Sequence, residues 1–126
     1  MLIERRKQRT ARVGLFGVGH DTYWDQFDGL LVEGIDFGMV DNAFRSYEAV
    51  RQMKAADPDL IFCDMLTYAT SSTWGIIRKE LDVPIVLVAL QPRKAMDYTQ
   101  ANTYMQLVND NICSLPEFVG VSVRMG

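Results

Sequence analysis

Four apolar runs are spaced along the chain, and each has the length and composition of a buried β-strand. The first covers residues 13–18 and is rich in Val, Leu and Phe; Gly17 and Gly19 are expected to release it into a turn. The remaining runs cover residues 35–40, 59–66 and 83–90. Gly38 weakens the second of these because glycine is disfavoured inside a strand.

Helical periodicity separates the strands. Trp24 to Leu31 predicts a helix of about two turns. Asp41-Asn42 is a plausible cap for a longer helix, and Asp57-Pro58 ends it because the residue before proline avoids helical angles. The apolar residues of that helix recur every three positions, at Phe44, Tyr47, Val50 and Met53.

Three further helices are expected. One follows the hydroxyl-rich turn at residues 67–73 and carries Trp74, Ile77 and Leu81. The pattern turns helical again from Arg93 onward, with Tyr104, Leu107, Val108 and Ile112 on one face. Pro116 then marks the first turn of a last helix.

Strands that alternate with helices in this order predict an α/β fold with an open, doubly wound parallel sheet, Rossmann-like or flavodoxin-like, of about four strands. The first crossover is close to the minimum length for a parallel connection. We expect one α/β domain at residues 12–126, preceded by a basic leader at residues 1–11. The leader is interpreted as a solvated arm, or alternatively as an interaction tail.

Composition narrows the function. The chain has 126 residues, 48% of them hydrophobic, and a net charge of -3. An acidic chain of this kind is not expected to bind nucleic acid, and its apolar runs are too short to span a membrane. The leader lacks the apolar core of a secretory signal, so we expect a cytoplasmic protein. Cys63 and Cys113 are expected to be buried, reduced thiols.

Polar and aromatic residues follow three of the predicted strands: His20 with its neighbours, Tyr68 with the hydroxyls after it, and Gln91. Carboxyl ends of parallel strands meet at one edge of a sheet, where such folds bind ligands. Donors, acceptors and aromatic planes suit a polyhydroxylated ligand such as a sugar. The structural alternative is that His20 and Asp21 hold the turn while Tyr23 and Trp24 pack on the first helix.

Other chemistries fit the sequence poorly. The dinucleotide fingerprint fails from Gly14 and again from Gly17, and no P-loop or nucleophile elbow is present. No metal site is expected, because the single histidine and the scattered acids lack ligand spacing, although Asp21 and Asp64 lie near strand ends. Ser71 and Ser72 have no neighbouring base and are interpreted as helix-capping residues.

Several segments, in order, resemble the N-terminal domain of the L-arabinose and L-fucose isomerase family. The resemblance covers nearly all of the chain after the leader. It is carried by residues 13–27 (VGLFGVGHDTYWDQF), 38–42 (GMVDN), 59–63 (DLIFC), 67–73 (TYATSST) and 83–92 (VPIVLVALQP). The segment at residues 114–118 (SLPEF) looks like the one that leads into the family's next domain.

The resemblance implies carbohydrate metabolism. The family consists of aldose–ketose isomerases that act on open-chain sugars with a divalent ion, usually Mn²⁺, whose ligands lie in later domains. Its N-terminal domain closes over the sugar site and makes subunit contacts, so the resemblance implies a homo-oligomer for the full-length protein. It assigns His20 to the substrate, with Gln91 and then Tyr68 as weaker candidates. No catalytic or metal residue is assigned in this chain.

Between Phe27 and Gly38 the chain is shorter than the family pattern, and the metal-binding domains are absent from the sequence given. We therefore expect a domain or fragment of a sugar isomerase that caps the sugar site, inactive as an isomerase by itself and without a cofactor of its own. The first alternative is a non-catalytic α/β module that binds a sugar or another small polar ligand. The second is a remnant that folds poorly because surfaces meant for partner domains are exposed.

Overall fold

The computed structural model describes residues 10–20 and 39–126. In this part of the chain, four parallel strands form one open sheet in the order β2-β1-β3-β4. The strands are β1 (Val13–Val18), β2 (Met39–Val40), β3 (Leu60–Met65) and β4 (Ile85–Val88). The helices are α1 (Ala43–Ala56), α2 (Ser71–Glu80), α3 (Thr103–Val108) and α4 (Leu115–Met125). The predicted α/β class with a parallel, Rossmann-like sheet is confirmed.

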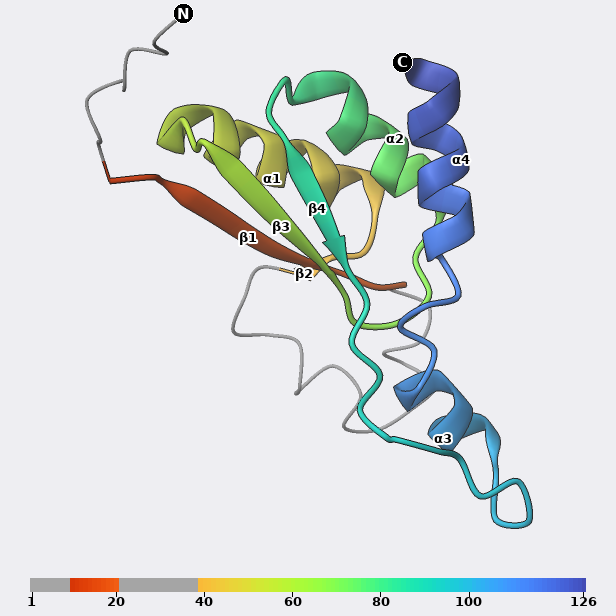
Figure 1. The fold of residues 1–126 in the computed structure, drawn as a ribbon. Coiled ribbons are helices and arrows are strands. Elements are labelled where there is room, and N and C mark those ends of the chain that lie inside the picture. Colours follow the sequence, from red (N-terminus) through yellow and green to blue (C-terminus); the bar gives the residue numbers. More distant parts are fainter. Residues whose placement is uncertain (1–9, 21–38) are drawn as a thin grey trace, which may run out of the picture.

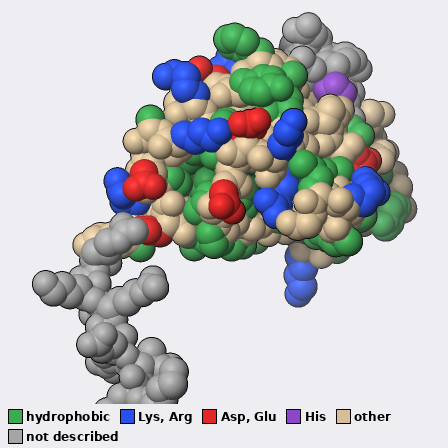
Figure 2. Space-filling model, turned by 90° about the horizontal axis from the view of Figure 1, so that it is seen from above, with side chains coloured by type: hydrophobic (Ala, Val, Ile, Leu, Met, Phe, Trp, Pro, Cys, Tyr) green, Lys and Arg blue, Asp and Glu red, His purple; other side chains and the backbone are tan. Residues whose placement is uncertain are grey.

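Helices α1, α2 and α4 cover one face of the sheet side by side, with α2 in the middle (Figure 1). The short helix α3 lies beyond the carboxyl ends of the strands, at the end of a long connection from β4 (Figure 1). On the helical side of the molecule, Lys and Arg side chains are interspersed with Asp and Glu (Figure 2). Neither positive nor negative charge therefore dominates the face that Figure 2 shows.

The core lies between the sheet and the helical layer. Alternation in β3 directs Ile61, Cys63 and Met65 to that side, and all three are buried. They meet buried residues from β1, β2 and the three helices: Phe16, Val18, Val40, Val50, Trp74, Ile77 and Phe118. The predicted apolar face of α2, formed by Trp74 and Ile77 and continued by Leu81, is therefore confirmed.

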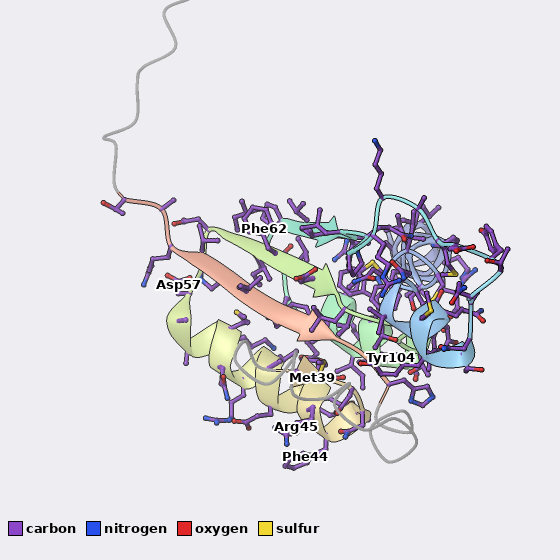
Figure 3. All side chains as sticks on the ribbon, turned by 90° about the horizontal axis from the view of Figure 1, so that it is seen from below. Met39, Phe44, Arg45, Asp57, Phe62 and Tyr104 are labelled. Carbon is purple, nitrogen blue, oxygen red and sulfur yellow. The ribbon has the colours of Figure 1, made fainter. Side chains whose placement is uncertain are left out.

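The start and end of α1 are confirmed, but half of its predicted buried face is wrong. Asn42 caps the helix by accepting from the N–H of Arg45 at 3.0 Å. Phe44 and Tyr47 are 77% and 59% exposed, and Phe44 points away from the sheet in Figure 3. A strict three-residue spacing drifts about 60° per step around a helix, so Phe44 and Met53 lie on opposite sides.

The face of α1 that meets the core instead follows i, i+3, i+4, i+7 spacing, at Ser46, Ala49, Val50 and Met53. Ser46 is fully buried, and its hydroxyl donates to the carbonyl oxygen of Asn42 at 2.9 Å. Because the hydroxyl is satisfied within the helix, a polar residue can occupy a core position there.

The prediction of helix from Arg93 onward is also wrong, since α3 begins only at Thr103. Asp97 Oδ1 accepts from the N–H of Thr99 at 3.0 Å and from its hydroxyl at 2.7 Å, which closes a local turn. Such side-chain bonds compete with helical ones. Asn102 then caps α3 by accepting from the N–H of Met105.

Smaller corrections concern glycine and cysteine. Gly17 lies within β1, where it pairs with Asp64 of β3, and the turn starts only after Val18. Cys63 is buried but Cys113 is only partly so, and both are free thiols. Residues 1–9 of the predicted leader and residues 21–38 lie outside the described residues. The second range includes Asp21, Tyr23, Trp24, the helix predicted at 24–31, most of the second strand and the shortened crossover.

Candidate functional site

The carboxyl ends of β1, β3 and β4 lie at one edge of the sheet, because these strands are neighbours and run in the same direction. His20 follows β1, Tyr68 follows β3 and Gln91 follows β4. The predicted arrangement of these three strands is confirmed. It defines the edge at which parallel α/β sheets meet their ligands.

Two of the three predicted residues contact each other. The imidazole of His20 lies against the phenol ring of Tyr68, with ring centroids 6.0 Å apart and planes tilted by 47°. The Tyr68 hydroxyl donates to Glu117 Oε1 at 3.4 Å, which connects the β3–α2 loop to the first turn of α4. Both rings are half-buried, and each combines an apolar surface with a polar group.

The loop that carries Tyr68 is held by a hydrogen bond to Ser114, the N-cap residue of α4. The N–H of Ala69 donates to the hydroxyl of Ser114 at 2.7 Å, and both residues are completely buried. Thr67, two positions earlier, is 2% exposed, and its hydroxyl has no hydrogen-bond partner among the described residues. Buried polar atoms normally have a hydrogen-bond partner, so the Thr67 hydroxyl is an exception to that rule.

The hydroxyls at the start of α2 bond mainly with one another. Thr70 is the N-cap residue, yet its side chain makes no capping hydrogen bond to the helix. Its Oγ1 instead lies 2.9 Å from Ser72 Oγ and 3.0 Å from Thr73 Oγ1. The capping role predicted for Ser71 and Ser72 is therefore not what this turn shows, because both residues lie inside the helix.

Gln91 is exposed and lines a separate cavity of about 710 Å³ between the end of β4 and α3. The described lining residues do not include His20 or Tyr68, so the structure does not join Gln91 to that pair. Polar residues make up most of the wall: Gln91, Tyr98, Asn102, Thr103, Gln106, Asn109 and Asp110. A wall of amide and hydroxyl groups offers donors and acceptors to a polyhydroxylated ligand.

Asn109 is the most informative residue of this wall. Only 8% of it is exposed, and its Nδ2 donates to the carbonyl oxygen of Met105 at 2.9 Å. Its Oδ1 is buried and has no hydrogen-bond partner among the described residues. An acceptor left without a partner costs about 1–3 kcal/mol, and this one lies behind the cavity wall, where a ligand in the cavity does not reach it.

Asp110 gives the cavity its negative charge. Its carboxylate accepts from Cys113, and this contact, after burial, raises the pKa of the Cys113 thiol to about 11. Cys113 therefore stays protonated at neutral pH and is not a nucleophile. Asp110, by contrast, remains available as an acceptor for hydroxyl groups at the cavity wall.

The sequence predicts little of this cavity, because the apolar positions after Arg93 indicate an amphipathic helix. Besides the apolar stripe, the same segment carries polar residues at i, i+4, i+7 spacing: Asn102, Gln106 and Asn109. All three line the cavity. A polar face with helical periodicity was thus the available signal.

No three His, Cys, Asp or Glu side chains gather closely enough to hold a metal ion in the described part of the chain. These residues consequently do not fit the Mn²⁺ that the resemblance implies for the full-length family. No helix among the described residues is long and apolar enough to cross a membrane. No protein-family model matches the chain, and no curated protein matches it significantly.

Proposed function

We propose that this chain is the N-terminal domain or a fragment of an L-arabinose/L-fucose isomerase-like aldose–ketose isomerase. In this proposal it covers the sugar site and contributes to subunit contacts, while the metal chemistry belongs to other domains. The residue pattern in five ordered segments supports the family, and the parallel sheet agrees with it. The observation that carries the sugar-facing role is the cavity lined by Gln91 and by the polar side chains Asn102, Gln106 and Asp110.

The chemistry of the cavity suits a sugar better than an anion or an apolar ligand. Neutral amides and hydroxyls dominate its wall, and the one carboxylate, Asp110, repels phosphate but accepts from hydroxyl groups. Tyr98 and Ile112 add apolar surface for the C–H face of a ring or an open chain. Within this role, Gln91 and Gln106 bind and orient hydroxyls and perform no bond-breaking step.

The experiment is calorimetric titration of the purified chain with L-arabinose and L-fucose at millimolar concentration. Substituting Gln91→Ala removes a neutral hydrogen bond, which is expected to weaken binding about fivefold. Gln100→Ala is the matched control, because Gln100 is also exposed but does not line the cavity. Absence of heat with both sugars, or equal loss in both variants, would contradict the sugar-facing role.

A second candidate is a non-catalytic α/β module that binds another small polar ligand. The observation that favours it is the mixed amide and hydroxyl lining of the Gln91 cavity, which suits small polar ligands in general and not sugars alone. The two candidates differ in selectivity. A sugar-isomerase domain is expected to prefer pentoses and deoxyhexoses, whereas a general module is expected to bind glycerol or inositol equally well. Competition titrations with these polyols against L-arabinose measure the difference.

A further inference from the structure

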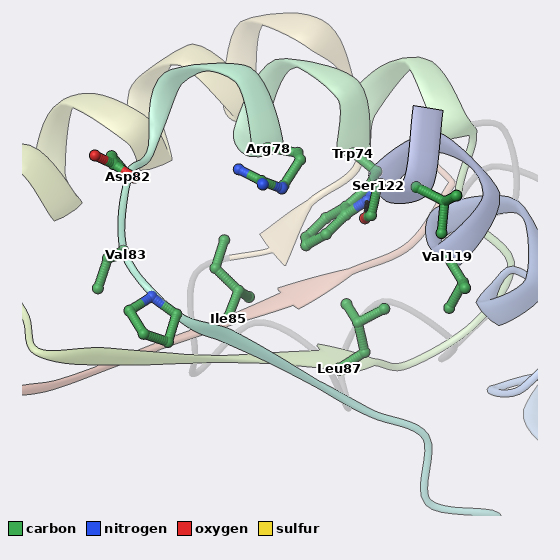
Figure 4. A pocket seen from close by; sticks show the side chains of 10 residues that line it. Trp74, Arg78, Asp82, Val83, Ile85, Leu87, Val119 and Ser122 are labelled. Atoms are coloured by element: carbon green, nitrogen blue, oxygen red, sulfur yellow. Dashed lines mark hydrogen bonds between the residues drawn. The ribbon is translucent and has the colours of Figure 1, made fainter. Parts of the chain in front are cut away.

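The sheet has helices on one side only within the described part of the chain. Helices α1, α2 and α4 lie together on that side, and no helix of residues 10–20 or 39–126 lies over the other (Figure 1). Ile85 and Leu87 of β4 point toward α2 and α4 (Figure 4). Successive side chains of a strand point to opposite faces, so Val86 and Val88 belong to the side without helices, which we call the outer face.

The outer face is apolar. Partners in a parallel ladder share a face, and Leu15 of β1 is the partner of Phe62 of β3, which is in turn the partner of Val86 of β4. Leu15 and Val86 are 45% and 41% exposed. Parallel sheets are normally covered on both faces, so this surface is expected to have a partner. The apolar side chains of the outer face are Val13, Leu15, Leu60, Phe62, Val86 and Val88.

The path of the chain indicates which segment crosses the outer face. From β2 to β3 and from β3 to β4 the chain moves in one direction across the sheet, and the connecting helices α1 and α2 lie on the same side (Figure 1). From β1 to β2 the chain moves in the opposite direction. Parallel crossovers share one hand, so a connection in the opposite direction passes over the opposite face. The right-handed rule therefore assigns residues 19–38 to the outer face.

The sequence of this connection contains an apolar stripe that suits such a surface. Residues 24–31 have helical periodicity, and Asp28 falls on the polar side of that pattern. Residues 19–38 also exceed the roughly one dozen residues that a parallel crossover needs. The apolar side of the pattern, with i, i+3, i+7 spacing, consists of Trp24, Phe27 and Leu31.

We propose that residues 24–31 pack on the outer face with their apolar stripe against Leu15 and Phe62, so that the chain covers both faces of its own sheet. Because β1 pairs with β2, both ends of the connection are held at the sheet. A segment tethered in this way acts at an effective concentration on the order of millimolar, which gives it an advantage over a second copy or another domain.

This inference does not depend on the proposed function, and none of the outer-face residues lines the Gln91 cavity. Contacts with other domains or subunits are then expected on other surfaces of the molecule. The sheet face also ceases to be a reason for poor folding of the isolated chain, because its apolar side chains are covered from within.

Nuclear Overhauser spectra of the full chain test the contact directly. Cross-peaks are expected between the ring protons of Trp24 or Phe27 and the methyl groups of Leu15 or Val86. Phe44 is the matched control, because its ring is 77% exposed on α1 and is expected to show no cross-peak to these methyl groups. Absence of cross-peaks from Trp24 and Phe27 overturns the proposal. So do cross-peaks that arise only between differently labelled copies, since a second copy then covers the face.

Substitutions on the two sides of the contact provide the second arm. Leu15→Ala and Phe27→Ala are each expected to raise the unfolding equilibrium constant at least about tenfold, because each removes apolar surface from a covered contact. Urea denaturation measures the change. Leu90→Ala and Asp28→Ala are the matched controls, since Leu90 is 68% exposed beyond β4 and Asp28 lies on the polar side of its segment. Both controls are expected to change the constant less than about threefold. Effects at Leu15 and Phe27 as small as those of the controls overturn the proposal.

Discussion

The indole of Trp74 stacks on the ring of Phe118, with centroids 5.0 Å apart and planes only 7° from parallel. The Nε1–H of Trp74 donates to the carbonyl oxygen of Phe118, and the Ser122 hydroxyl lies 3.0 Å from the same nitrogen. Both rings are almost completely buried. One residue pair therefore joins α2 to α4 by stacking and by hydrogen bonding, and α4 in turn anchors the loop that carries Tyr68.

Truncation of this pair is expected to be among the most destabilising changes in the chain. Phe118→Ala leaves a cavity beneath Trp74 and is expected to lower the free energy of unfolding by about 3–5 kcal/mol. Chemical denaturation followed by Trp fluorescence measures the change. Phe44→Ala is the control, because the same truncation at an exposed position is expected to change stability by less than about 0.5 kcal/mol.

The two sides of α1 yield a second prediction. Val50→Ala removes buried methyl groups and is expected to cost about 1–3 kcal/mol, whereas Tyr47→Ala removes a mostly exposed ring and is expected to be nearly neutral. Thermal unfolding followed by circular dichroism measures both. A larger effect at Tyr47 than at Val50 would show that the outer face of α1 is covered in solution.

The two sides of α1 also show how far the sequence predicts the fold. Strands and helix ends were predictable because they depend on local signals, such as the Asn42 cap and the αL residue Asp57 before Pro58. The buried face of α1 was not predictable in the same way. The spacing of Phe44 and Tyr47 indicates a different face from the one around Ser46 and Val50 that meets the core. Ser46 can be buried because its hydroxyl bonds to the backbone, and the pattern of apolar residues does not reveal such a bond.

The candidate site was predictable only in part. The carboxyl ends of parallel strands meet at one edge of the sheet, so the meeting of His20 and Tyr68 could be expected. The cavity beside Gln91 depends on where α3 begins, which Asp97 and Asn102 determine through their side-chain bonds. An unpartnered acceptor such as Asn109 Oδ1 is a property of packing and has no signature in the sequence.

Asp64 supplies a pH-dependent prediction. It lies on β3 between Gly17 and Val88, and burial raises the pKa of its carboxyl group above the ordinary value of 3.8. The folded state therefore disfavours ionisation, and this carboxyl lowers stability at neutral pH. The penalty is absent below about pH 3.8, where the group is protonated in both states, and grows as pH rises through the folded-state pKa.

Asp64→Asn is accordingly expected to unfold at a higher denaturant concentration than wild type at pH 7. The difference is expected to shrink toward zero as pH falls to about 4. Parallel urea titrations between pH 4 and pH 7 measure it. Asp82→Asn is the control, because Asp82 is exposed, and its effect on stability at pH 7 is expected to be small. A difference that grows on acidification would contradict the assignment to burial.

The two thiols are expected to react at different pH values. The pKa of Cys113 is raised to about 11, and burial raises that of Cys63 further still. Alkylation by iodoacetamide in the folded protein is therefore expected to be slow at pH 8, and to accelerate at Cys113 before Cys63 as pH rises. Mass spectrometry after timed quenching identifies the modified residue. Fast modification of Cys63 at pH 8 would mean that the sheet opens locally.

Thr67 and Thr73 permit a sharper comparison, because both are 2% exposed threonines within the same turn and helix start. The Thr73 hydroxyl bonds to Thr70 Oγ1 at 3.0 Å, whereas the Thr67 hydroxyl has no partner among the described residues. Thr73→Val is expected to cost about 1 kcal/mol because it breaks a hydrogen bond and leaves Thr70 with one fewer. Thr67→Val removes an unsatisfied group and is expected to be neutral or stabilising by a similar amount. Paired denaturation curves measure the two differences.

If Thr67→Val stabilises the chain but weakens sugar binding, the Thr67 hydroxyl serves the ligand. Destabilisation equal to that of Thr73→Val would instead assign the Thr67 hydroxyl a structural hydrogen bond.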